Sequence, residues 1–197
     1  ATGVVLSDYA NDNLTASFIP EKNYKDKVSK DAVPLSYMFA VTNLVDSSDK
    51  MNVSIFGQEW DGFISPTLIE GRYPENDQEV VVDQSFENYG IKLGDAIQLN
   101  GSETSFKIVG LTRENKFFTE PVVFTSLTTY WDLQGTTKGN RSISVLVLQN
   151  DVEVTGDGLK QISIQKMISK IPGYTPQVNV FSGMILAMIV ITGLIVG

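Results

Sequence analysis

Residues 79–110 read EVVVDQSFENYGIKLGDAIQLNGSETSFKIVG. Glu79–Asp83 (EVVVD) predicts a short buried strand, because a run of β-branched residues bounded by polar ones is typical of a strand that is covered on both faces. Residues 84–88 predict one or two helical turns, which end at Gly90 because glycine readily adopts the left-handed conformation that closes a helix. The stretch therefore begins as a strand followed by a short helix.

Two hairpin-like turns divide the second half of this stretch. Gly94-Asp95 and Asn100-Gly101 are turn-forming pairs. Because strand side chains alternate between faces, two pairs of apolar residues each share a face, namely Ile97 with Leu99 and Phe106 with Ile108. We therefore predict a small antiparallel β module, barrel-like in form. It continues through the strand PVVFT (residues 121–125) to an aromatic segment around Tyr130 and Trp131, and a flexible loop follows at residues 135–140.

Strand and helix signals flank this module on both sides. PLSYMFAVTNLV (residues 34–45) and residues 51–56 predict neighbouring strands, preceded by a short amphipathic helix near residues 21–30. ISVLVL (residues 143–148) predicts another strand. Residues 159–171 predict a helix that Pro172-Gly173 ends, with an apolar face at i, i+4 and i+7 formed by Ile164, Ile168 and Ile171.

These elements indicate an α+β fold of two lobes. Residues 1–58 and 141–177 form a discontinuous strand-helix lobe, and residues 59–140 form the inserted small antiparallel β lobe. Residues 178–197 form the start of a transmembrane helix. This arrangement keeps the connections short.

The C-terminal run is the strongest single signal. Residues 178–197 carry no charge and end in GMILAMIVITGLIVG. About twenty helical residues span roughly 30 Å, the thickness of the hydrocarbon core of a bilayer. A buried helix of a globular protein is the alternative. Lys160, Lys166 and Lys170 precede the run, and such positive flanks favour the cytoplasmic side, although this rule is weak for large domains. We expect the chain to continue beyond Gly197 and a membrane anchor to precede Ala1.

Composition removes several classes of function. The net charge is −8, which disfavours nucleic-acid binding. Residues 59–103 contain ten acidic side chains against two basic ones, and such a face keeps a domain soluble. Histidine and cysteine are absent, which excludes a Ser-His-Asp triad, imidazole or thiolate metal sites and a cysteine nucleophile. We predict a non-enzymatic domain with no cofactor, no metal and no catalytic residues.

Residues 69–114, which read IEGRYPENDQEVVVDQSFENYGIKLGDAIQLNGSETSFKIVGLTRE, resemble the extracytoplasmic core domain of MacB-like, FtsX-type ABC transporter permeases. PVVFTSLTTYWDL (residues 121–133) and ISIQKMISKIPGYTP (residues 162–176) fit the same pattern, followed directly by the apolar run. The resemblance covers residues 33–197. No single motif is specific to this family. The order of the motifs and their placement before a membrane helix are moderately specific.

The resemblance implies a domain on the extracytoplasmic face of the cell membrane, with the strand-helix lobe near the membrane and the inserted β lobe farther away. It also implies that the domain couples cytoplasmic ATP hydrolysis to substrate export or to mechanical work outside. Its implied partners are the bilayer, a cytoplasmic ATP-binding subunit or domain, a second permease in a dimer, and a peptide or lipoprotein substrate. No G-x-x-x-x-G-K-[ST] run for phosphate binding occurs in this chain. A single-anchor cell-surface domain that binds or senses a ligand is the alternative.

The candidate residues have structural or coupling roles. Gly71 is expected in a conformation that a Cβ would penalise, and Arg72 is expected to fork onto a carboxylate or a carbonyl. Gly94 and Asp95 turn the chain into the β module, and Pro172 and Gly173 form a joint toward the membrane helix. Aromatic residues form either a partner-binding surface or the core of the small lobe: Phe117, Phe118, Tyr130 and Trp131.

Overall fold

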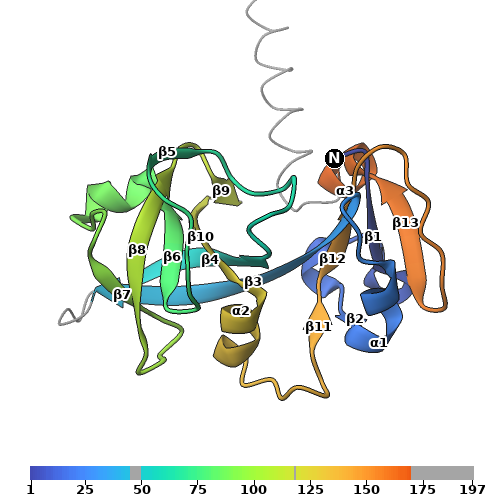
Figure 1. Ribbon diagram of the computed structural model, residues 1–197, viewed down its shortest axis with the longest axis horizontal. Coiled ribbons are helices and arrows are strands. Elements are labelled where there is room, and N and C mark those ends of the chain that lie inside the picture. The colour runs from blue at the N-terminus through green and yellow to red at the C-terminus, as the bar shows by residue number, and fades with distance from the viewer. Residues whose placement is uncertain (45–49, 118, 170–197) are drawn as a thin grey trace, which may run out of the picture.

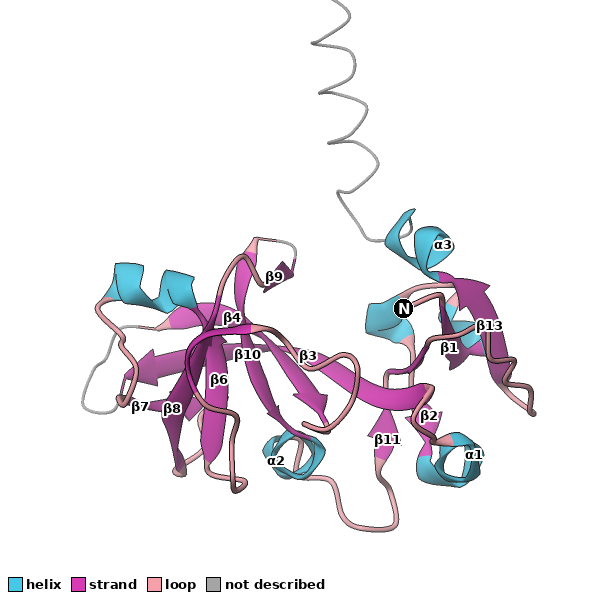
Figure 2. Ribbon diagram, turned by 45° about the horizontal axis from the view of Figure 1, so that its top comes forward, coloured by secondary structure: helices cyan, strands magenta, loops and turns pink. Residues whose placement is uncertain are grey.

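The fold is described from a computed structural model, which describes residues 1–44, 50–117 and 119–169. Two groups of strands lie side by side, and the long strand β3 (Ala32–Leu44) runs through both of them (Figure 1). The α+β class is confirmed, and strands dominate the fold (Figure 2).

The larger group is a closed barrel. Its strands pair in the cyclic order β3, β4, β10, β6, β8, β7 and back to β3. The bounds of the other five barrel strands are β4 (Met51–Gln58), β6 (Glu79–Asp83), β7 (Ala96–Leu99), β8 (Ser105–Thr112) and β10 (Glu120–Ser126). Two of the pairs, β4 with β10 and β6 with β8, are parallel, so the predicted small antiparallel β module is only partly correct. The parallel pairs arise because the chain crosses over the barrel between these strands instead of returning through a tight turn.

Short elements complete the barrel region. Gly90 ends η4 with a φ of 77°, as predicted. Strand β5 pairs with β8, β9 pairs with β10, and α2 follows β10. These elements have the bounds β5 (Leu68–Gly71), η4 (Gln84–Tyr89), β9 (Lys116–Phe117) and α2 (Leu127–Leu133).

The smaller group joins the two halves of the sequence. Strand β1 (Gly3–Ser7) lies between β12 (Val145–Leu148) and β13 (Leu159–Ser163), and β12 pairs with the first residues of β3. A second, two-stranded sheet pairs β2 (Ile19–Pro20) with β11 (Ser142–Ile143). The short helices here are η1 (Asp8–Ala10), η2 (Leu14–Ala16), α1 (Glu21–Tyr24), η3 (Lys25–Lys27) and α3 (Ile164–Ser169).

The predicted helix at 159–171 needs correction. Its first five residues form β13, which pairs with the whole of β1, from Gly3 opposite Ser163 to Ser7 opposite Leu159. The helix α3 begins only at Ile164, and Ser163 caps it because its Oγ accepts a hydrogen bond from the backbone N–H of Lys166 at 3.3 Å. The apolar face is partly present, since Ile164 packs against the core of the smaller group, whereas Ile171 lies outside the described residues.

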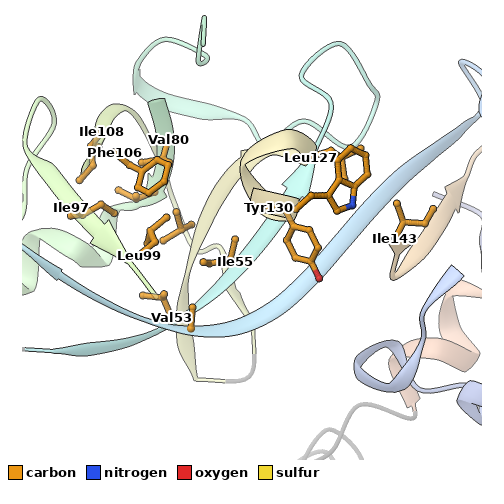
Figure 3. Packing of buried hydrophobic residues seen from close by; sticks show 14 of the residues in the cluster. Val53, Ile55, Val80, Ile97, Leu99, Phe106, Ile108, Leu127, Tyr130 and Ile143 are labelled. Atoms are coloured by element: carbon orange, nitrogen blue, oxygen red, sulfur yellow. The ribbon is translucent and has the colours of Figure 1, made fainter. Parts of the chain in front are cut away.

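The hydrophobic core is continuous across the two groups. Inside the barrel, the side chains of Ile55, Ile97 and Leu99 are fully buried, and each contributes about 1.5–3 kcal/mol to stability (Figure 3). Tyr130 of α2 lies at one end of this core, and the same cluster continues to Ile143 beside the smaller group. The predicted domain boundary between residues 58 and 59 remains a prediction. The strand pairing shows that β3 and β4, which precede this boundary in the sequence, are part of the barrel.

Candidate functional site

Gly71 sits where β5 and β8 approach each other closely. Its φ is +80°, and it lies opposite Gly110 in the register of the two strands. A Cβ on Gly71 would overlap the carbonyl oxygen of Val109 and lie 2.9 Å from the Cα of Gly110. A side chain at this position would therefore be disfavoured for two reasons, as expected: the positive φ, and the clash of its Cβ with the backbone of β8.

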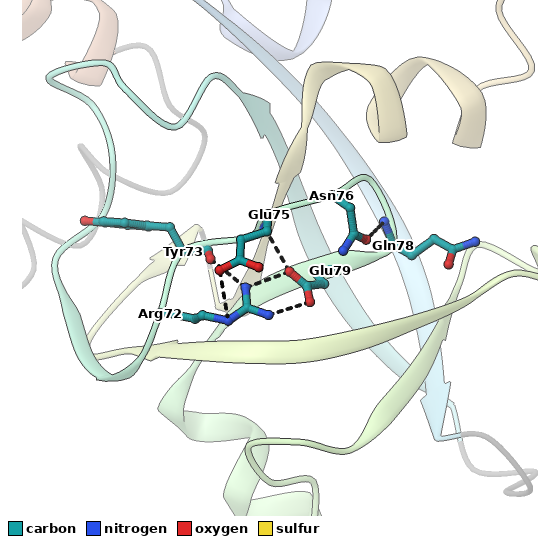
Figure 4. A network of polar contacts seen from close by, with 6 residues as sticks. All are labelled: Arg72, Tyr73, Glu75, Asn76, Gln78 and Glu79. Atoms are coloured by element: carbon teal, nitrogen blue, oxygen red, sulfur yellow. Dashed lines mark hydrogen bonds and ion pairs between the residues drawn. The ribbon is translucent and has the colours of Figure 1, made fainter.

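Arg72 forks onto Glu79, as Figure 4 shows. Its Nη1 donates to Glu79 Oε2 at 2.7 Å and its Nη2 donates to Glu79 Oε1 at 2.6 Å. The Glu79 carboxylate also accepts the backbone N–H of Glu75 at 2.8 Å, and Arg72 Nη1 donates to the carbonyl oxygen of Tyr73 at 3.0 Å. These bonds tie the chain between β5 and β6 to the start of β6.

This ion pair alters the acidity of the carboxyl group. The Arg72 guanidinium, helped by the Glu75 amide, lowers the pKa of Glu79 from 4.5 to about 2. At the other end of β6, Asp83 is buried and accepts the backbone N–H of Ser85 at 3.0 Å and that of Asn115 at 2.7 Å. Both carboxylates are thus satisfied by local partners, which is typical of groups that hold a fold together.

Gly94 and Asp95 turn the chain into β7. Gly94 has a φ of +92°, and no atom lies within 4 Å of the position of a Cβ there. Asp95 Oδ2 accepts the backbone N–H of Lys92 at 2.8 Å, and the carbonyl oxygen of Asp95 accepts the N–H of Ile108 at 2.9 Å. Gly94 through its backbone and Asp95 through both its side chain and its carbonyl oxygen shape this turn, and the role of the two residues in coupling to the membrane stays a prediction.

The four aromatic residues do not form one surface. Tyr130 and Trp131 are 2% and 8% exposed, so the prediction of a partner-binding surface is wrong for them, and the alternative of a core position is confirmed. Their polar atoms are paired internally: Tyr130 Oη donates to the carbonyl oxygen of Tyr37 at 3.0 Å, and Trp131 Nε1 donates to that of Ser142 at 2.7 Å. Phe117 packs instead outside the barrel, with its ring centre 4.6 Å from that of Tyr37. Phe118, Pro172 and Gly173 lie outside the described residues.

Sequence reasoning missed an ion-pair cluster at the end of the smaller group. Asp12, which follows η1, is 6% exposed, and Lys160 Nζ of β13 lies 2.7 Å from its Oδ1. Lys166 Nζ of α3 lies 3.0 Å from its Oδ2, and the two lysines lower the pKa of Asp12. The cluster fastens α3 to the loop that follows β1. Burial and the two lysine partners set Asp12 apart from other acidic loop residues, and the sequence reveals neither.

Metal and membrane-spanning features are absent from the part of the chain that the structure describes. Within residues 1–44, 50–117 and 119–169, no group of three or more acidic side chains is arranged to hold a metal ion. In the same ranges, no helix has both the length and the apolar character needed to cross a membrane. The predicted membrane helix at residues 178–197 lies outside the described residues.

Two solved structures share this fold. The periplasmic region of MacB from Actinobacillus actinomycetemcomitans matches with a TM-score of 0.58 and 15% identity, over 87% of this chain and 94% of that one. The extracellular domain of the noncanonic ABC-type transporter YknZ from Gram-positive bacteria matches with a TM-score of 0.56 and 13% identity, over 77% and 84%. The likeness at these identities is one of fold.

Curated relatives agree with the structural matches. The HrtB protein of Staphylococcus haemolyticus, named for a hemin transport system permease, is 21% identical over 139 residues, which are 67% of this chain and 38% of that protein. An HrtB protein of Staphylococcus epidermidis is 18% identical over 137 residues. No family model matches the chain. The chain spans less than two fifths of the length of these relatives. The resemblance to MacB-like permeases that the sequence suggested is confirmed by these transporter relatives and fold neighbours.

Proposed function

We propose that this chain is the non-catalytic extracytoplasmic domain of an ABC transporter permease. The observation that carries the proposal is the match of its fold to nearly the whole periplasmic region of MacB. The relatives and fold neighbours are transporter permeases and their outer domains, which are not enzymes in the catalytic sense. The lack of histidine and cysteine in this chain agrees with a role other than hydrolysis.

The position of the two ends of the described chain supports this role. Strand β1 starts beside the end of β13, and the backbone N–H of Ile164 donates to the carbonyl oxygen of Thr2 at 3.4 Å. In Figure 1, the N-terminus and α3 lie at the same end of the molecule. The two ends of the described chain, Ala1 and Ser169, therefore lie on one side of the fold. We propose that this side faces the bilayer and that the barrel belongs to a lobe farther out.

The proposed mechanical role rests on rigid connections. Asp12 joins α3 to the loop after β1 through Lys160 and Lys166. Strand β3 then joins the smaller group to the barrel, because its first residues pair with β12 and its later ones with β4 and β7. A displacement of α3 would thus be passed to the barrel without any flexible linker.

The proposed partners are a cytoplasmic ATP-binding subunit or domain, the bilayer and a second permease in a dimer. A peptide or lipoprotein is the proposed cargo. Hemin, for which the staphylococcal relatives are named, is not proposed as a ligand of this domain, because the chain is only 18–21% identical to those proteins and spans less than two fifths of their length.

Topology is tested by labelling a single cysteine in the complete permease, after any other cysteine in it has been replaced. Tyr89, which is 60% exposed on η4, is a suitable position for Tyr89→Cys. A membrane-impermeant maleimide should label this variant in intact cells. Labelling that requires permeabilised cells would contradict the proposal. Copurification with an ATP-binding subunit separates the permease from the alternative of a single-anchor sensor, which should purify without one.

A further inference from the structure

A polar cavity lies at the end of the barrel where β10 leads into α2. It has a volume of about 670 Å³ and lies between three segments: the second half of α2 with the residues after it, the turn that joins β7 to β8, and the residues just before β6. These segments meet because the end of β10 and the starts of β6 and β8 lie at the same end of the barrel. In Figure 1, α2 lies at the lower end of the molecule, away from the N-terminus and α3. Sites that hold whole small molecules usually have volumes of about 300–1,000 Å³, and this cavity falls within that range.

The charge of the lining favours a cation. Asp77, just before β6, and Asp132 of α2 line the cavity, and none of the described residues that line it is a lysine or an arginine. Neither carboxylate has an ion-pair partner within residues 1–44, 50–117 and 119–169. Two uncompensated carboxylates in one cavity attract a positively charged ligand and repel a negatively charged one.

Asp77 is held in place with one oxygen left available. The hydroxyl of Ser126 donates to its Oδ1 at 2.5 Å, and the hydroxyl of Thr129 donates to its carbonyl oxygen at 2.7 Å. Ser126 also caps α2, because its Oγ accepts the backbone N–H of Thr129 at 3.0 Å. The Oδ2 of Asp77 has no hydrogen-bond partner among the described residues. A carboxylate that is already fixed loses little conformational entropy when a ligand binds it.

The apolar part of the lining distinguishes an organic cation from a metal ion. Phe106 of β8 and Leu133 of α2 line the same cavity, whereas hard metal ions are surrounded by six or more oxygen ligands. An ammonium group donates up to three hydrogen bonds, which carboxylate oxygens accept, and an alkyl chain can lie against apolar side chains. We infer that this cavity binds a small aliphatic amine in its ammonium form, with the charge at Asp77 and Asp132 and the alkyl chain against Phe106 and Leu133. This inference goes beyond the proposed function and does not depend on it.

The test is a titration of the 197-residue chain followed by NMR at neutral pH. The probes are pentylamine, which is positively charged, and 1-pentanol, which has the same alkyl chain without the charge. We expect pentylamine to shift the backbone amide signals of Gly101 and Gln134, which line the cavity, and to bind about tenfold more tightly than 1-pentanol. Raising the salt concentration from about 0.05 M to about 0.5 M should remove most of this difference, because salt screens charges. Equal affinities at low salt would overturn the inference. Tighter binding of N-acetyl-L-lysine methylamide than of pentylamine would also overturn it, in favour of a basic residue of a peptide.

A variant of nearly the same shape assigns the binding to the cavity. Asp132→Asn should weaken the binding of pentylamine about fivefold, leave that of 1-pentanol unchanged and keep the Tm, because the carboxylate of this exposed residue has no partner among the described residues. Asp157→Asn is the matched control, since it removes the same charge at an exposed position in the loop before β13, and it should change neither affinity. An equal loss in the two variants would show a general attraction to the negative chain and would overturn the inference. If Asp132→Asn does not fold, the comparison of the two probes on the unaltered chain decides.

Discussion

Replacing Gly71 with alanine should destabilise the chain more than the same replacement at Gly94. Both glycines have a positive φ, +80° and +92°, in which an L-residue costs about 1–2 kcal/mol. At Gly94 the position of a Cβ is open, so this is the whole expected loss. At Gly71 the new Cβ would meet the backbone of Val109 and Gly110, which cannot rotate away, and overpacking adds about 1–3 kcal/mol.

Denaturant unfolding and thermal unfolding of the two variants measure the difference. For a chain of this length, each kcal/mol lowers the Tm by about 2–4 °C, so Gly71→Ala should melt several degrees below Gly94→Ala. The m-value should stay the same in both, because the exposed surface of the unfolded chain does not change. Equal losses at the two positions would refute the close approach of β5 to β8.

Three further predictions concern paired groups. Because the pKa of Glu79 is lowered from 4.5 to about 2, its ion pair with Arg72 is complete above about pH 4.5 and is lost as the pH falls toward 2, so Glu79→Gln should flatten the loss of stability across that window in acid unfolding curves. Asp12→Asn should speed amide hydrogen exchange in α3, whereas Asp26→Asn, which removes an exposed pair, should leave it unchanged. Trp131→Phe should lower the free energy of unfolding by about 1–3 kcal/mol, because the carbonyl oxygen of Ser142 loses its buried donor; an unchanged value would show that water replaces the indole.

The sequence is most informative where local pattern and burial agree. The run of valines in β6 is covered on both faces, and the alternation at Ile97 and Leu99 places both side chains inside the barrel, as predicted. Gly90 ends η4 because the left-handed conformation that a helix end requires is local to one residue. Such features depend on a few neighbouring residues, so they can be predicted from the amino-acid sequence.

The pairing of strands that are distant in the sequence could not be predicted. Strand β13 pairs with β1 from the other end of the chain, and no periodicity within residues 159–163 distinguishes this pairing from the first turn of a helix. The closure of the barrel by β7 against β3 is likewise a contact between distant segments. The parallel pairs depend on how the crossovers run, which residue patterns do not specify.

The candidate residues follow the same division. The fork of Arg72 was predictable from the chemistry of guanidinium, while its partner Glu79 was one of several acidic residues nearby. The sequence left two interpretations of Tyr130 and Trp131 open, a partner-binding surface or a core position, because aromatic side chains are common in both cores and interfaces. The cavity beside Asp77 and Asp132 has no sequence signature, because its lining comes from three segments that only the fold brings together.

We propose that this domain moves in response to ATP on the other side of the membrane, and a distance measurement in the assembled transporter tests for this motion. Spin labels at Tyr89→Cys in the two copies of a permease dimer report the separation of their barrels by pulsed dipolar spectroscopy. We expect ATP to shift the distribution of this separation, and we expect Asp12→Asn to reduce the shift because it weakens the ion pairs that hold α3. An unchanged distribution in a transporter that hydrolyses ATP would rule out the proposed motion.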